Sequence, residues 1–244
     1  MVSLLSVFSL RGGLRLPGWA VMAFLFALSP AAVAQSKNLA PGFEHLPKGG
    51  TIVIMPTDIE LFEISGGGVI EPKADWTQMA STHFRSALEA KRKKLEMNSV
   101  FLSEKDADEV AEVNALHAAV ARAIALHHFG PSNLALPTKD GKLDWSLGDA
   151  IQVIRKKTGA DYAFFSWVRD SYVSGARVAA MIALAMLGVG VPGGQQVGYA
   201  SLVDLKTGRV VWFNRLARVT GDLREAASAS ESLDALLDNF PATK

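Results

Sequence analysis

The chain has 244 residues and no cysteine. That absence excludes disulfide bonds, a thiolate nucleophile, a cysteine-ligated zinc site and a lipidated N-terminal cysteine. The chain also lacks an excess of charge of either sign, because it holds 25 basic and 24 acidic residues. A nucleic-acid-binding domain usually concentrates basic residues on one face. The balance of charge therefore predicts that nucleic acid is not a partner.

The first 34 residues have the order of a secretory signal peptide. Arg11 and Arg15 precede the apolar run GWAVMAFLFAL, and a small-residue cleavage site ends at Ala34. We expect cleavage after Ala34 and a periplasmic location, which suits a chain without disulfides. The alternative is that the apolar run is retained as an N-terminal membrane anchor. Residues 35–49, which are rich in proline and glycine, are expected to form a tether.

Short β-branched runs alternate with amphipathic stretches through residues 50–240, which predicts a single α/β domain. Strands are expected at residues 51–56, 99–104 and 160–168, and in a hairpin over residues 197–216. Helices are expected at residues 75–95, 103–130, 147–159 and 222–239. This order predicts one mixed β-sheet of about five strands packed by helices, with an apolar helical insertion before the C-terminal hairpin. Gly66–Gly68 favours a turn with positive φ over a phosphate-binding loop.

The insertion is the run AAMIALAMLGVGVPGG, residues 179–194. As a helix, residues 179–191 would extend about 20 Å, whereas the hydrocarbon core of a bilayer is about 30 Å thick. The run is therefore too short to span a membrane as a helix. Its glycines at positions 188, 190 and 193 match the letters of the dinucleotide-binding fingerprint. That fingerprint requires a strand before it and a helix after it, and here a strand follows, so the sequence does not favour a nucleotide site.

An apolar helical arm must be covered by something, which leaves two hypotheses. In one, the sheet and helices of the same chain cover it. In the other, a protein partner, a second copy or a membrane surface covers it, because contiguous exposed apolar patches usually mark interaction sites. The side chains expected to make that contact are Met181, Ile182, Leu184, Met186 and Leu187.

No catalytic constellation is recognisable in the sequence. None of the five histidines falls in a tight metal-ligand pattern, and no GxSxG motif is present. His127 and His128 are expected to be helix-end residues, with His117 almost three helical turns from His127. The sequence thus predicts a non-enzymatic protein with no cofactor, no metal and no catalytic residue. The alternative is a periplasmic hydrolase or small-ligand-binding protein with a site built from loops 64–71 and 131–142.

Several segments together resemble the periplasmic α/β domain of curli-secretion lipoproteins and TolB N-terminal-like proteins. They are TIVIMP, the helix opening at ADW, SVFLSE, TGADYAFFSWV and GYASLVDLKTGRVVWFN. The markers are the Thr158–Asp161 turn into a strand and the Asp204–Gly208 link that leads to Trp212. The resemblance implies a non-enzymatic role in envelope assembly or secretion, through oligomers or a membrane-associated complex. The chain departs from it by lacking a lipidated cysteine and an insertion adequate for a membrane hairpin.

Overall fold

The structure is a computed structural model that describes residues 36–94 and 97–244. The expected signal peptide and its cleavage site at Ala34 lie outside the described residues. Within the described ranges, no helix combines the length and the hydrophobicity that a membrane span requires.

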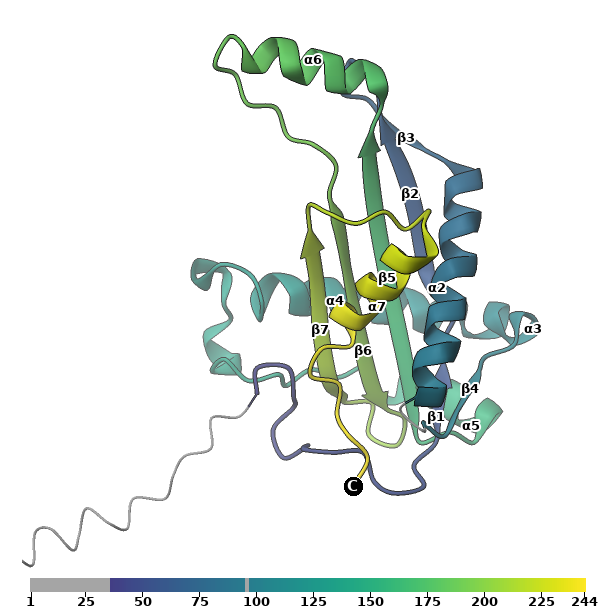
Figure 1. Cartoon of the computed structure of the whole chain (residues 1–244). Coiled ribbons are helices and arrows are strands. Elements are labelled where there is room, and N and C mark those ends of the chain that lie inside the picture. The colour runs from purple at the N-terminus through teal and green to yellow at the C-terminus, as the bar shows by residue number, and fades with distance from the viewer. Residues whose placement is uncertain (1–35, 95–96) are drawn as a thin grey trace, which may run out of the picture. The chain divides into compact units, whose positions relative to one another are not determined.

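The described residues form one mixed sheet with helices on its two faces (Figure 1). The strands are β1 (Ile52–Ile54), β2 (Asp58–Ile64), β3 (Ile70–Pro72), β4 (Ser99–Phe101), β5 (Tyr162–Val173), β6 (Gln196–Asp204) and β7 (Val210–Arg218). The helices are α2 (Ala74–Lys94), α3 (Glu104–Ala107), α4 (Ala111–His127), α5 (Gln152–Thr158), α6 (Gly175–Ala185) and α7 (Ala226–Leu236). Short 3-10 turns are η2 (Asp108–Val110), η3 (Ser132–Leu134), η4 (Pro137–Lys139) and η5 (Gly148–Ile151).

Strand β5 lies at the centre of the sheet. One of its edges pairs in parallel first with β1 and then with β2, and its other edge pairs antiparallel with β6. Strand β4 extends the sheet beyond β1, β3 extends it beyond β2, and β7 extends it beyond β6. The α/β class and the single mixed sheet are confirmed, and α6 is the insertion expected before the β6–β7 hairpin.

The sheet has seven strands where about five are expected, because the residues on the two sides of the Gly66–Gly68 turn form β2 and β3. Pro56 ends β1, and the chain then continues as β2 along the same edge of β5. The turn itself is as expected, since Gly68 has φ of 85° and its N–H donates to the Ser65 carbonyl. Each strand is too short to be distinguished by periodicity alone.

Alternate side chains of the sheet fill two separate cores. Phe164 and Trp212 pack under α2 and α7, whereas Phe165 and Phe213 pack under α4 and α5. Figure 1 shows α2 and α7 in front of the strands and α4 behind them. The continuous apolar run at the start of β5 follows from this arrangement, because a central strand covered on both faces has no polar side.

Several helices and turns begin or end at the capping residues that the sequence predicts. Gly159 closes α5 in the left-handed region, with φ of 68°. The β6–β7 turn is held by Asp204, whose carboxylate accepts hydrogen bonds from the backbone N–H groups of Lys206 and Thr207. Ser103 caps α3 by accepting a hydrogen bond from the Asp106 N–H at 3.3 Å. These contacts satisfy backbone groups that would otherwise lack partners at element ends.

Part of the segment assigned to a tether packs on the sheet. Ala40 donates its N–H to the Val211 carbonyl at 2.9 Å, and Leu39 forms a bridge with Trp212. Leu46 is 4% exposed and belongs to the core under α2 and α7. This segment therefore covers part of the outer edge of β7 and contributes to the core.

We predict that Leu46→Ala lowers the free energy of unfolding by about 2–5 kcal/mol, the usual cost of truncating a buried leucine. Denaturant unfolding measures the change. Val219→Ala is the matched control, since Val219 is 84% exposed and its truncation should change stability by less than about 0.5 kcal/mol. Equal stability of the two variants would show that residues 36–49 do not contribute to the core.

Candidate functional site

Residues 175–195 form an arm that connects β5 to β6. Ser174 caps α6 by accepting a hydrogen bond from the Arg177 N–H at 3.1 Å. After α6 the chain turns at Gly188, which has φ of 77°, and returns to the sheet without regular structure. Figure 1 shows the arm beyond the ends of β5 and β6, away from α4 and α7.

The arm leaves its apolar side chains largely uncovered. Ile182 is 54% exposed, Met186 is 82% exposed and Leu187 is 77% exposed, and no residue of α6 is buried. Met181 and Leu184 are half-buried, and Met181 packs beside Gly193 on the returning limb. The rest of the described residues therefore leave Ile182, Met186 and Leu187 largely uncovered, whereas Met181 and Leu184 are partly covered.

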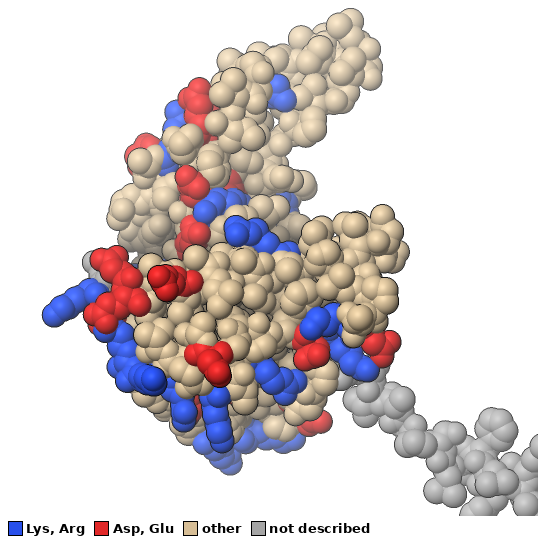
Figure 2. Space-filling view, turned by 180° about the vertical axis from the view of Figure 1, so that it is seen from behind, with Lys and Arg blue, Asp and Glu red and all other residues tan. Residues whose placement is uncertain are grey.

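The arm is also free of charge over most of its length, since residues 178–195 contain no acidic residue, basic residue or histidine. The space-filling view shows an almost unbroken uncharged surface at this end of the described residues, with a hollow between the arm and the rest of the chain (Figure 2). Arg177 lies at the base of the arm, beside the Gly68 turn. A solvated protrusion would normally carry charged side chains, so the composition of this arm is unusual for a surface exposed to water.

The three glycines of the fingerprint-like pattern sit in the wrong structural order for a nucleotide. Gly188 follows the end of α6, and the segment that contains Gly190 and Gly193 leads into β6. A dinucleotide-binding turn has the reverse order, a strand followed by a helix whose N-terminus faces the pyrophosphate.

Close backbone contacts fix both ends of the arm. Gly66 packs on Ala176, with 3.2 Å between the Ala176 Cβ and the place where a Cβ of Gly66 would lie. At the other end, a Cβ on Gly194 would lie 1.9 Å from the Ser171 carbonyl oxygen, so only glycine fits there. The Ser171 hydroxyl and N–H both donate to the Gln195 carbonyl at 3.1 Å. The arm therefore leaves the sheet at a defined point.

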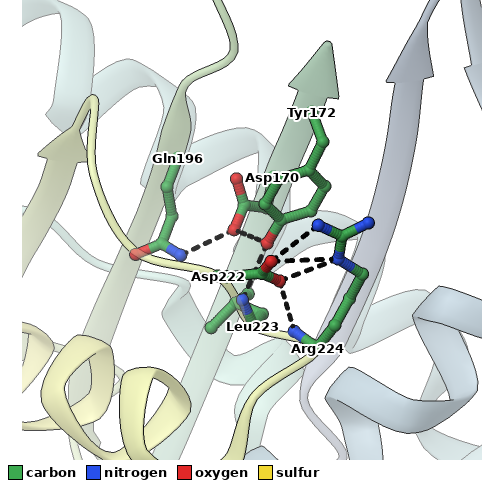
Figure 3. A network of polar contacts seen from close by, with 6 residues as sticks. All are labelled: Asp170, Tyr172, Gln196, Asp222, Leu223 and Arg224. Carbon is green, nitrogen blue, oxygen red and sulfur yellow. Dashed lines mark hydrogen bonds and ion pairs between the residues drawn. The ribbon is translucent and has the colours of Figure 1, made fainter. Parts of the chain in front are cut away.

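A buried polar network lies directly beneath the arm, where β5 and β6 begin to separate (Figure 3). The Asp170 carboxylate accepts hydrogen bonds from the Tyr172 hydroxyl at 2.5 Å and from the Gln196 amide at 2.7 Å. Gln196 in turn accepts a hydrogen bond from Ser232 of α7 at 2.7 Å. The network thus joins both roots of the arm to the C-terminal helix.

The segment before α7 completes the network. The Tyr172 hydroxyl accepts a hydrogen bond from the Leu223 N–H at 2.7 Å. Asp222 and Arg224 form an ion pair with Nη2 and Oδ2 2.6 Å apart, and the Arg224 guanidinium lies 4.1 Å from the centre of the Tyr172 ring. Residues from three separate parts of the sequence therefore meet at one point under the arm.

Burial and pairing shift the acidic groups of this network in opposite directions. Asp170 is 3% exposed, and loss of solvation raises its pKa above the ordinary value, although the two side-chain donors act against the shift. The hydrogen bond from Arg224 lowers the pKa of Asp222. Burial, together with the hydrogen bond to Asp170, raises the pKa of Tyr172. Pairing with Arg224 thus favours the ionised form of Asp222, whereas burial disfavours the ionised form of Asp170.

His127 and His128 lie at the end of α4, apart from the arm, and bond to backbone carbonyls. His127 ends α4 and bonds to the Leu134 carbonyl, and His128 bonds to the Lys37 carbonyl, as expected for helix-end residues. Both line a small pocket that includes part of loop 131–142. Within the described residues, no group of three or more His, Cys, Asp or Glu side chains is placed to hold a metal ion.

Sequence reasoning did not find the polar network. The expected strand at residues 160–168 ends just before Asp170 and Tyr172, because charged residues at 169 and 170 interrupt the apolar run. In the structure β5 continues to Val173. The continuation of the strand beyond residue 168 could have been predicted from the spacing of Val168, Asp170 and Tyr172, which places all three on one side of an extended strand.

No protein-family model matches the chain, and no curated protein sequence matches it. Solved structures similar to it include the PelC dodecamer from Paraburkholderia phytofirmans, with 15% identity, a TM-score of 0.40, and coverage of 84% of this chain and 95% of that one. The LpoB C-terminal domain from Salmonella enterica has 13% identity, a TM-score of 0.28, and coverage of 74% and 88%. Lipoprotein GNA1162 from Neisseria meningitidis has 11% identity, a TM-score of 0.32, and coverage of 78% and 98%. The more specific resemblance to curli-secretion and TolB N-terminal-like proteins stays a prediction.

We predict that lowering the pH raises the free energy of unfolding of the wild type relative to that of the Asp170→Asn variant. Because the pKa of Asp170 is raised by folding, the folded chain binds a proton at a pH where the unfolded chain does not. The difference in free energy of unfolding between wild type and variant should therefore grow as the pH falls from 7 to about 4. It should level off below the ordinary aspartate value of 3.8.

Denaturant unfolding at several pH values measures this difference. It increases by at most about 1.4 kcal/mol for each unit by which folding raises the pKa of Asp170. The asparagine keeps an oxygen for Tyr172 and Gln196, and the Asp222–Arg224 pair is present in both proteins, so its own titration cancels. Parallel stability curves for the two proteins would contradict a raised pKa for Asp170.

Proposed function

We propose that the chain is a non-enzymatic accessory protein of the cell envelope that is exported to the periplasm and binds another protein, or a second copy of itself, through the arm. The observation that carries the proposal is the exposure of Ile182, Met186 and Leu187 on an uncharged protrusion. Export is proposed from the signal-peptide order of residues 1–34.

The energetics favour a partner over permanent solvent exposure. Complete burial of one leucine, isoleucine or methionine side chain contributes roughly 1.5–3 kcal/mol. The three exposed side chains lie on one short protrusion whose roots are fixed at Gly66 and Gly194. A partner can therefore bury them without disturbing the sheet, and little conformational entropy is lost because the base of the arm is already ordered.

The arm is better suited to a protein surface than to a bilayer. Helix α6 has 11 residues, about 16 Å at 1.5 Å per residue, which is roughly half the thickness of the hydrocarbon core. Residues 178–195 also contain no tryptophan, tyrosine, lysine or arginine, the residues that usually anchor a segment at the membrane interface.

We predict that Ile182→Asp combined with Met186→Asp weakens association with the partner at least tenfold, because each change places a charge where an apolar side chain would be buried. Sedimentation velocity measures self-association. Photo-crosslinking from position 187 in cells that express the full chain captures a protein partner. Cosedimentation with vesicles of phosphatidylethanolamine and phosphatidylglycerol measures membrane binding.

The control is Val100→Asp, which places one aspartate at a 56% exposed valine on the edge strand β4, outside the arm. Circular dichroism establishes that all variants keep the fold. The proposal is wrong if self-association and crosslinking are the same in the double variant and the control. It is also wrong if vesicles prove to be what the arm binds, with no protein captured.

A further inference from the structure

A pocket that is separate from the arm lies between α4 and the sheet. It has a volume of about 270 Å³ and opens between the β1–β2 link, the middle of α4, and strands β5 and β6. Its walls include Phe165, Trp167 and Tyr199, and its polar groups include Asn114 and His117. Neither the loop 64–71 nor the loop 131–142 contributes to it, so it differs from the loop-built site considered from the sequence.

Asn114 brings an unsatisfied acceptor to this pocket. Its side-chain Oδ1 is buried, and within the described residues no group donates a hydrogen bond to it. A buried polar atom without a partner is destabilising, so such an atom is usually paired with protein, ordered water or a bound molecule. Asn114 lies one helical turn from His117, and both side chains line the same space.

His117 is held in place and kept neutral. It is 4% exposed, its ring stacks on Phe165 at 3.9 Å, and its Nε2 lies 2.6 Å from the Ser201 hydroxyl. Loss of solvation lowers its pKa to about 3, so the ring carries no charge near neutral pH.

The rest of the lining combines aromatic side chains with the Thr57 and Ser166 hydroxyls, which bond to each other at 2.9 Å, and with Asp58 at the edge. Trp167 stacks on Tyr199 with 5.1 Å between ring centres and an angle of 11° between their planes. The Asp58 carboxylate at the edge of the pocket is already paired with Arg169 at 2.8 Å, and Arg169 also pairs with Glu60 at 3.3 Å. An ionised ligand would have to give up its hydration without an opposite charge to receive it, so this interior favours a neutral molecule.

We infer that this pocket binds a small uncharged aromatic molecule that carries a hydrogen-bond donor, with the donor directed at Asn114 Oδ1 and the ring against Trp167, Tyr199 and Phe165. An apolar cavity of about 150 Å³ accepts benzene. The present pocket is larger, so molecules of one or two rings such as phenol or indole match it in size. Aromatic rings pack favourably on one another in offset or edge-to-face arrangements.

The test titrates the purified protein with phenol, anisole and benzoate and follows backbone and tryptophan signals by NMR. Phenol has the ring and the donor, anisole lacks the donor, and benzoate adds a charge. We expect saturable shifts at Asn114 and Trp167 with phenol, about tenfold weaker binding of anisole, and no binding of benzoate. No saturable shift up to the solubility limit of phenol, with the pocket holding water alone, would overturn the inference.

Three variants distinguish binding at this pocket from nonspecific binding elsewhere on the protein. Asn114→Ala should weaken phenol binding about tenfold while leaving anisole unchanged. Ala118→Leu, which fills the pocket from the next turn of α4, should abolish binding of both. Asn133→Ala, at an exposed position in η3, is the control and should bind as the wild type does. Equal affinity for phenol in all four proteins, each with an unchanged melting temperature, would show that binding occurs elsewhere.

Discussion

The structure depends on the pairing of one long strand. Strand β5 has 12 residues and bonds to β1 and β2 along one edge and to β6 along the other. Its first residues separate the two cores, because Phe164 and Phe165 point to opposite faces. Its last residues carry Asp170 and Tyr172 and lead into the arm. The hydrophobic interior, the polar base and the exposed protrusion are therefore positioned by the same ladder of backbone hydrogen bonds.

The two ends of this strand have opposite chemistry. Where helices cover both faces, apolar side chains at every position are stabilising. Towards Val173, a polar network replaces the apolar contacts and is satisfied from β6, from α7 and from the segment before it. A network of this kind is favourable only when its members are paired, and the Asp170 carboxylate is paired twice. That pairing accounts for how a charged residue can stand in the sheet so close to an apolar arm.

The parts of the fold that depend on local chemistry could be predicted from the sequence. Gly159 and Gly208 adopt the left-handed conformation that their turns require, and the apolar insertion falls between β5 and the C-terminal hairpin as expected. The parts that depend on contacts between distant segments could not. Asp170 and Asp222 are 52 positions apart, and nothing in their spacing shows that Tyr172 and Arg224 bring them together. The pocket beside Asn114 is hidden for the same reason, because its walls come from two strands and a helix that are remote in sequence.

The antiparallel register of β5 and β6 makes the arm the connection of one large hairpin. Asp170 pairs with Gln196 across the ladder, and Ser171 bonds to Gln195 where the two strands part. The outer part of the arm, residues 178–193, can therefore change in length or sequence without altering which residues pair in the sheet. The exposed surface of the arm can therefore vary while the strand pairing beneath it stays the same.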